Sequence, residues 1–207
     1  MQTDNDVRFT AVLSKIAFTE VTKNNQLEFK YFGEKRRVKR GLMQVSFKTE
    51  GISWNIFTLP PASRFTVRKD DPQSHKFRQS EALVIRNSIK KKYPSHKKAK
   101  YLIVGDFNDT KKSKPLKRFL KSGKQTLSIM IPCKDSRGEA WTYSYAKEDV
   151  YSRVDFILAS PSFFPYVKNS EGIIFDQPPT LKASDHRLVY LDLTFWATLF
   201  IKYKPQE

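Results

Sequence analysis

The segment that most constrains the fold is Tyr101-Leu-Ile-Val, a run of apolar residues with no polar residue between them. A strand with one face in water alternates apolar and polar residues, so this run is predicted to lie inside a sheet that is covered on both faces. Gly105-Asp106-Phe107-Asn108-Asp109 follows directly and is therefore predicted to be a loop at the end of a buried strand. Loops in that position commonly carry functional groups on a rigid scaffold.

Other segments of the chain also have the composition of strands, being rich in β-branched and aromatic residues and bounded by turn or charged residues. They are residues 42–47, 52–58, 154–158 and 188–193. A helix is predicted between the second and third strands, with Asp71-Pro72 at its start and Pro94 after its end. Its buried face would carry Ala82, Ile85, Ile89 and Tyr93, which recur at helical spacing.

A second, shorter helix is predicted over residues 115–121. Strands dominate, and the longer helix joins two of them, which indicates packed sheets flanked by helices. No linker or repeat divides the chain, so residues 1–207 are predicted to form a single domain.

The charge balance is unusual: 38 Lys and Arg residues face 21 acidic residues, for a net charge of +17. This balance favours polyanionic partners such as nucleic acid. Fourteen basic and two acidic residues lie between Arg86 and Lys124, so this stretch supplies twelve of the seventeen net charges. They form either a basic rim around the 105–109 loop or an ordinary solvated helix surface. The second reading is favoured for Lys90, Lys91 and Lys92, which would surround a helix terminus.

The sequence also excludes several classes of protein. A single cysteine, Cys133, rules out an intrachain disulfide framework and a cysteine-based zinc site. No apolar run approaches the length of a transmembrane helix. The first residues lack a signal-peptide pattern, which predicts a cytoplasmic location by default, unless a leader has been lost from the N-terminus.

Candidate functional residues stand at the ends of the predicted strands. Asp106 and Asn108 offer the hard oxygen ligands that Mg²⁺ or Mn²⁺ prefers, but Asp and Asn after a strand also cap turns through their own backbone. Asp185 and His186 can divide metal binding and proton transfer between them, although such a pair is also common on ordinary surfaces. Asp155 is the only acid in an apolar strand and needs a partner, for which an imidazolium is suitable.

Taken together and in order, these segments resemble the endonuclease/exonuclease/phosphatase family of the DNase I-like superfamily. The matching pieces are Tyr-Leu-Ile-Val-Gly-Asp-Phe-Asn-Asp (101–109), Ser-Arg-Val-Asp-Phe-Ile-Leu (152–158) and Ala-Ser-Asp-His-Arg-Leu-Val (183–189). Residues 10–17 and 64–72 resemble family segments of lower specificity, so the resemblance runs from about Thr10 to about Leu193. It implies a four-layer α/β sandwich, in which two packed, mostly antiparallel sheets are flanked by helices.

The resemblance also implies a role for each matching residue. Asp106 would position the attacking water and contact the metal, and Asn108 would hold a phosphate oxygen or a metal-bound water. Asp185 would be a metal ligand. His186 would contact the scissile phosphate and transfer a proton, with Asp155 fixing its tautomer. The implied reaction is in-line attack of water on a phosphoester, assisted by Mg²⁺ or Mn²⁺.

Arginines near the start of the longer helix are candidates for binding the substrate phosphate. Arg64 and Arg68 flank that start and are predicted to grip phosphate together with Asn108. Arg78 lies close by in sequence, but its spacing of three residues from Glu81 predicts a local ion pair instead.

Two departures from the family pattern bear on activity. The first strand-helix-strand unit, with its metal-binding Glu in a "QE" segment, has no counterpart here, and Glu20 stands in the context of a later strand. Pro60 occupies the place of a phosphate-contacting histidine in the family's "HLKSR" motif. We weigh three explanations, a truncated gene, a degenerate binding protein and a site completed by another chain, and favour truncation.

The sequence thus predicts a divalent-metal-dependent phosphoesterase that acts on nucleic acid or another phosphoester, with weak metal binding and impaired activity. The alternative is a catalytically inactive module of the same fold that binds nucleic acid or a phosphate ligand. Because the missing unit would leave a sheet edge uncovered, a partner chain or a second copy is predicted to cover that edge.

Overall fold

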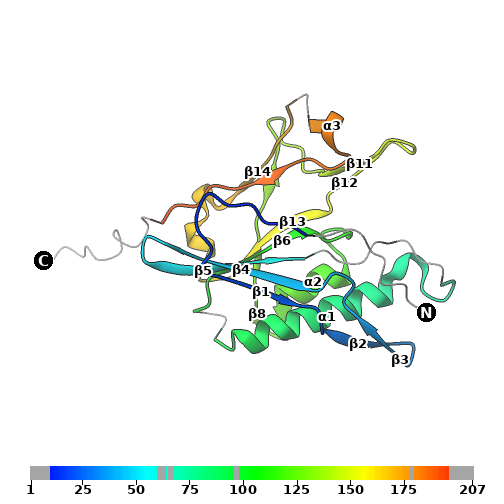
Figure 1. Cartoon of the computed structure of the whole chain (residues 1–207). Coiled ribbons are helices and arrows are strands. Elements are labelled where there is room, and N and C mark those ends of the chain that lie inside the picture. Colours follow the sequence, from blue (N-terminus) through cyan, green and yellow to red (C-terminus); the bar gives the residue numbers. More distant parts are fainter. Residues whose placement is uncertain (1–9, 60–63, 65–67, 96–97, 178–179, 196–207) are drawn as a thin grey trace, which may run out of the picture.

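A six-stranded mixed sheet forms the middle layer of the molecule (Figure 1). The computed structural model describes residues 10–59, 64, 68–95, 98–177 and 180–195. All neighbouring strands of this sheet are antiparallel except β5 and β6, which are parallel and are joined through helix α1. In spatial order the strands are β1 (Glu20–Asn24), β4 (Leu42–Thr49), β5 (Ile52–Thr58), β6 (Tyr101–Asp106), β13 (Asp155–Ala159) and β9 (Ile129–Met130).

A smaller sheet and several hairpins complete the strands. The small sheet contains β10 (Cys133–Lys134), β14 (Gly172–Ile174) and β15 (Val189–Tyr190). The hairpins pair β2 (Glu28–Tyr31) with β3 (Glu34–Arg37), β7 (Lys121–Ser122) with β8 (Gln125–Thr126), and β11 (Tyr143–Tyr145) with β12 (Val150–Ser152). The helices are α1 (His75–Lys92), α2 (Lys114–Leu120) and α3 (Thr180–Ala183), with 3₁₀ turns at Pro72–Ser74, Phe164–Tyr166 and Lys168–Ser170.

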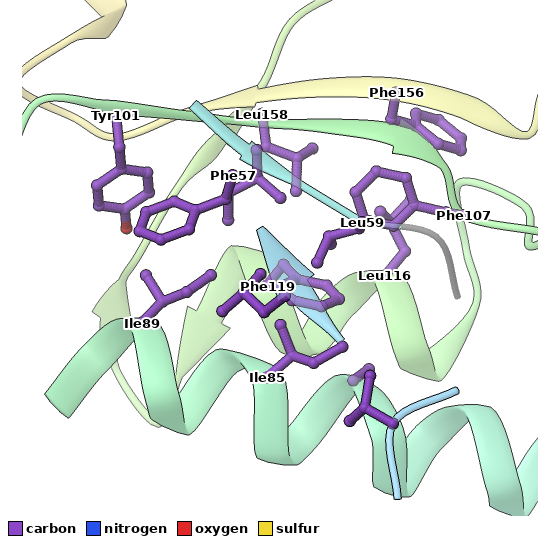
Figure 2. Close-up of a cluster of buried hydrophobic side chains, with 14 residues drawn as sticks. Phe57, Leu59, Ile85, Ile89, Tyr101, Phe107, Leu116, Phe119, Phe156 and Leu158 are labelled. Atoms are coloured by element: carbon purple, nitrogen blue, oxygen red, sulfur yellow. The ribbon is translucent and has the colours of Figure 1, made fainter. Parts of the chain in front are cut away.

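One hydrophobic core lies between the large sheet and the pair α1 and α2. Figure 2 shows Phe57, Tyr101 and Leu158 from the sheet pointing toward Ile85 and Ile89 of α1. Leu116 and Phe119 of α2 fill the same layer and are at most 2% exposed. The face of α1 predicted from helical spacing is therefore the face that packs.

A second core lies on the opposite face of the large sheet. Side chains such as Val45, Trp54 and Ile157 pack there against Ile174 of β14 and against Phe163. Alternate residues of β13 serve the two cores, because Ile157 faces the second core while Phe156 and Leu158 face the first. This accounts for the absence of polar alternation in the central strands.

The predicted fold class is confirmed: the chain is an α/β protein with two packed sheets and helices over one of them. The large sheet is mostly antiparallel, as predicted. Helices α1 and α2 form the helical layer over the large sheet. The only described α-helix after them is α3, a single turn. No helix in the described part of the chain is both long and apolar enough to cross a membrane.

The predicted strands differ from the observed ones mainly at the C-terminal end. The strand predicted over 188–193 is reduced to Val189–Tyr190. After β15 the chain leaves the small sheet and bonds to the 3₁₀ turns, where Lys168 donates to the Asp192 carbonyl and Thr194 to the Tyr166 carbonyl. The apolar residues at 191 and 193 are thus explained by packing in the second core.

The start of α1 also differs from the prediction. Pro72–Ser74 forms a 3₁₀ turn, and Gln73 and Ser74 have positive φ angles of 57° and 54°, so the α-helix begins at His75. The Asp71 carboxylate still caps it, because it accepts the backbone N–H groups of Lys76 at 2.9 Å and Phe77 at 3.1 Å. The predicted end before Pro94 is confirmed. Helix α2 begins one residue earlier than predicted, at Lys114.

An apolar surface remains on the small sheet. Ile173 of β14 and Tyr190 of β15 are register partners, and they are 40% and 38% exposed. Phe175 and Leu188 continue this surface, with the Phe175 N–H bonded to the Leu188 carbonyl at 2.9 Å. The predicted covering of an open sheet edge by a partner chain or a second copy concerns another part of the molecule and stays a prediction.

Gly105 is required by the close approach of two strands, which gives a first test of the fold. Its φ is +147°, and a Cβ built on it would lie 2.2 Å from the Leu59 carbonyl oxygen. We expect Gly105→Ala to lower the free energy of unfolding by about 2–5 kcal/mol, from backbone strain plus the clash. Gly33→Ala, at φ +83° in open space, should cost only about 1–2 kcal/mol. Equal losses in urea unfolding would contradict the close approach.

Candidate active site

The pairing of β6 with β13 brings the first two candidate carboxylates together. Asp106 ends β6 and Asp155 begins β13, and they are directly opposed in the antiparallel register. Opposed residues on neighbouring strands have Cβ atoms about 4.5–5.5 Å apart, so their side chains share one environment. Both residues are half-buried.

The segment containing His186 is held beside these carboxylates. His186 Nδ1 lies 2.8 Å from the Asp155 carboxylate, so the partner predicted for the isolated acid of β13 is present. The backbone of this segment bonds to the β11 region: Ser144 donates to the Asp185 carbonyl at 2.9 Å and Arg187 donates to the Thr142 carbonyl at 2.8 Å. The Tyr143 ring lies 4.9 Å from the imidazole, centroid to centroid, and forms a wall of the site.

A buried ion pair anchors the same segment. Arg187 donates from Nη2 to the Asp135 carboxylate at 2.7 Å, and both side chains are at most 2% exposed. Its guanidinium also stacks on Trp141, 4.0 Å from the ring centroid. Desolvation alone would raise the pKa of Asp135, but the Arg187 guanidinium and two backbone N–H groups hold that pKa well below its ordinary value. Sequence reasoning missed this pair, which spans 52 positions.

The loop after β6 is a turn capped by its own aspartate. Asp106 Oδ1 accepts the Asn108 backbone N–H at 2.7 Å, and Asn108 has a φ of +49°. Asp106 thus caps the turn, as one of the two interpretations of the sequence predicted, and the cap uses only one of its two carboxylate oxygens. Among the described residues the other oxygen accepts no hydrogen bond, so it can still serve a cation or a water.

Helix α1 holds this loop through a buried arginine. The spacing of Arg78 and Glu81 predicts a local ion pair, but Arg78 instead pairs with the Asp109 carboxylate and donates to the Asn108 carbonyl at 2.7 Å. The Arg78 side chain is fully buried and that of Asp109 is 6% exposed. The sequence spacing misled because Asp109 approaches from another element.

The structure separates the other two arginines predicted to bind phosphate. Arg64 Nε donates to the Asn108 carbonyl at 2.9 Å, so its guanidinium lies at the loop. Arg68 donates to both carboxylate oxygens of Asp70, at 2.9 and 2.8 Å, and its guanidinium stacks 4.4 Å from the Phe32 ring centroid. Arg68 is therefore turned toward the β2–β3 hairpin.

Negative charge concentrates around the imidazole. Burial raises the pKa of Asp106, and the facing Asp155 carboxylate adds to this rise. The hydrogen bond to Asp155 raises the pKa of His186 above its ordinary value, and the charges of Asp106 and Asp185 act in the same direction. Burial raises the pKa of Tyr143, with a further contribution from Asp185. Asp185 itself is exposed.

Comparisons with known proteins identify the family. A model described as "Endonuclease/Exonuclease/phosphatase family" matches residues 6–186. The chain belongs to the endonuclease/exonuclease/phosphatase family. No curated protein matches the sequence.

Solved structures agree with this family's fold. A family protein from Leptotrichia buccalis superposes with a TM-score of 0.57 at 13% identity, covering 87% of this chain and 62% of that one. Sphingomyelinase C from Streptomyces griseocarneus gives 0.53 at 14% identity, covering 87% and 63%. A mannosyl-6-phosphatase from Bacteroides thetaiotaomicron gives 0.52 at 20% identity, covering 75% and 58%. This chain thus spans less than two thirds of each of these chains.

The site offers few side chains that could hold a metal ion. In the described part of the chain, no group of three or more His, Cys, Asp or Glu side chains is arranged to hold a metal ion. Mg²⁺, however, usually keeps several waters and is held by one or two carboxylates. Asp185 and the second oxygen of Asp106 fit that more limited requirement.

The structure also bears on the two departures from the family pattern, at Glu20 and Pro60. Glu20 is opposed to Ser46, Ser46 to Asn55, and Asn55 to Tyr101 across the large sheet. Glu20 therefore lies level with the beginning of β6, whereas Asp106 lies at its end, so Glu20 cannot replace the family's metal-binding Glu. Pro60, in the place of the family's phosphate-contacting histidine, lies outside the described residues.

The burial of the Arg78–Asp109 pair predicts that removing the Asp109 carboxylate strongly destabilises the fold. We expect Asp109→Ala to lower the free energy of unfolding by about 3–5 kcal/mol, because it leaves the Arg78 guanidinium buried without its counterion. The matched control is Asp70→Ala, which breaks the exposed pair with Arg68 and should cost far less, because solvent screens that pair. Chemical denaturation measures both. Similar losses in the two variants would mean that Arg78 is not buried as described.

The Asp155–His186 contact predicts that the pKa of His186 changes when Asp155 is substituted. Because Asp155 raises the pKa of His186, Asp155→Asn should lower it, and NMR of the imidazole Cε1–H against pH measures this. The pair stabilises the wild type fully below about pH 6.5, and this contribution is lost as pH rises through the higher folded pKa. Asp155→Asn should therefore lose stability chiefly at acidic pH. Asp192→Asn, at an exposed site, should leave the titration of His186 unchanged.

Proposed function

We propose that this chain is a phosphoesterase domain that hydrolyses phosphodiester bonds, with nucleic acid as its substrate. The observation that carries the proposal is the 2.8 Å contact between His186 Nδ1 and the Asp155 carboxylate, beside Asp106. An imidazole held in this way combines a fixed tautomer with a raised pKa, as proton transfer in phosphoester hydrolysis requires.

The hydrogen bond assigns the two imidazole nitrogens different tasks. Nδ1–H donates to Asp155, which leaves Nε2 to exchange a proton with the substrate. In the protonated form, favoured by the surrounding carboxylates, His186 would bind a phosphate oxygen and give its proton to the departing alkoxide. Water would add to phosphorus as the ester P–O bond breaks. Asp106 would accept a proton from that water.

The remaining residues would position the phosphate and a cation. Asn108 is held by the Asp106 turn, and Arg64 lies against its carbonyl, so both would face a phosphate at the loop. Asp185 and Asp106 would hold Mg²⁺ or Mn²⁺, which when bound neutralises charge developing on the phosphate. The net charge of +17 supports a polyanionic substrate.

One observation favours a second candidate function, a non-catalytic module that binds nucleic acid or a phosphate ligand. The described residues offer a cation at most two carboxylates, with Glu20 at the opposite end of the sheet. A weakly held cation would leave the phosphate-binding groups in place while slowing hydrolysis. Both functions therefore require binding of the phosphate ligand, and only the first requires that the ligand be hydrolysed.

Hydrolysis of supercoiled plasmid and of bis(p-nitrophenyl) phosphate, with Mg²⁺ or with EDTA, tests the proposal. We expect cleavage only with the metal. His186→Ala should reduce the rate about 10²–10⁴-fold, because it removes the proton-transfer group. Asp185→Ala should raise the Mg²⁺ concentration needed for half-maximal rate, because it removes a ligand.

Asp192→Asn is the control, since Asp192 is exposed and lies outside the site. Cleavage by the wild type that neither substitution at 185 or 186 reduces would show that the site assignment is wrong. An absence of cleavage, combined with DNA binding that weakens as salt rises, would favour the binding module.

A further inference from the structure

The basic residues between 86 and 124 gather largely on the helical layer. Arg86 and Lys90 lie one turn apart on α1, and Lys90 Nζ contacts Ser122 Oγ of β7 at 3.4 Å. Burial and the nearby Arg118 guanidinium of α2 lower the pKa of Arg86, so the two helices bring like charges together. We call five basic residues of these neighbouring elements the two-helix basic face: Arg86 and Lys90 of α1, Lys114 and Arg118 of α2, and Lys121 of β7.

No acidic side chain neutralises this face within the described residues. None of its five members lies within ion-pair distance of a carboxylate there. The only acids between positions 86 and 124 are Asp106, in the candidate site, and Asp109, paired with Arg78. The face therefore keeps its full positive charge for an external partner.

The α1 part of the two-helix basic face, Arg86 and Lys90, lies away from the candidate site. Arg86 and Lys90 line a small hollow together with Tyr101, the first residue of β6. Asp106 is the last residue of that strand, and a six-residue strand is about 17 Å long. Arg86 and Lys90 thus do not form a rim around the 105–109 loop, whereas Lys111, Lys112 and Lys114 follow that loop in the sequence.

We propose that the two-helix basic face binds the sugar-phosphate backbone of nucleic acid, as a contact surface separate from the hydrolytic site. Arg86 and Lys90 are about 6 Å apart along the helix axis, which lets successive cations reach different phosphates of one strand, spaced about 3.4 Å along a duplex. Backbone contacts of this kind need no base recognition and carry no sequence preference.

Nucleic acid fits this face better than a membrane surface does. Helices that lie on membranes insert large apolar side chains such as Trp, Phe and Leu beside their basic residues. The exposed large apolar side chains of the described chain all lie outside positions 86–124. The face therefore offers charge without an apolar anchor.

Binding of a fluorescent 20-base-pair DNA duplex to the full chain in EDTA tests this proposal without hydrolysis. The variant Lys90→Gln/Lys114→Gln/Lys121→Gln should bind more weakly, and the slope of log K against log salt should shrink by up to about 2.7, or 0.9 for each lost contact. The control Lys23→Gln/Lys48→Gln/Lys134→Gln loses the same charge from exposed lysines of β1, β4 and β10 and should change the slope far less. Circular dichroism melting establishes that both variants fold.

The outcomes separate this proposal from the hydrolytic one. DNA binding retained by His186→Ala but weakened by the face variant supports it, whether or not the wild type cleaves. Equal losses in the two triple variants would overturn it, because net charge alone would then explain binding. Tighter binding to phosphatidylserine vesicles than to DNA at the same salt would also overturn it, in favour of a membrane.

Discussion

The antiparallel pairing of β6 with β13 is the contact on which the other features of the structure depend. It opposes Asp106 to Asp155 at one end of the strands, and along their length it supplies side chains to both cores. A shift of one residue in this register would turn every side chain of β13 to the other face. The apolar residues would then lose both cores, and Asp155 would lose His186. Packing energy and site geometry are thus set by the same register.

Two buried ion pairs hold two loop segments against this frame of strands. Arg78 with Asp109 holds the loop after β6 against α1, and Arg187 with Asp135 holds the segment of His186 against the region before β11. A buried pair contributes little net stability compared with apolar residues of the same size, but removing one partner is costly. Their effect is therefore to allow one arrangement of each loop and to penalise others. Of the two, the Arg187–Asp135 pair lies next to His186 in the sequence and so bears on its distance from Asp155.

The sequence predicts local features well and distant contacts poorly. The apolar run of β6 and the helical spacing of α1 each leave a signal within a few positions, and the structure confirms these two elements. The loop predicted over residues 105–109 begins later than predicted, because β6 continues through Gly105 to Asp106. Arg78 and Asp109 are 31 positions apart, and Arg187 and Asp135 are 52 apart, so no periodicity relates them. Nearest-neighbour spacing instead favoured Glu81 for Arg78. Only the ordered family motifs, whose separation reflects the fold, indicated that Asp155 would meet His186.

The charge distribution explains why a basic protein can carry an acidic site. Asp106, Asp155 and Asp185 surround His186, so the immediate surroundings repel a phosphate even though the whole chain is at +17. Over distances beyond about 10 Å, salt screens exposed charges, so the helical lysines cannot neutralise these carboxylates at physiological ionic strength. They can raise the local concentration of a polyanion, whereas charge within the site is reduced by the raised pKa of Asp106, by the pairing of Asp155 with His186 and by any bound cation. Arg86 and Lys90 thus lie toward one end of β6, and the carboxylates around His186 lie toward the other.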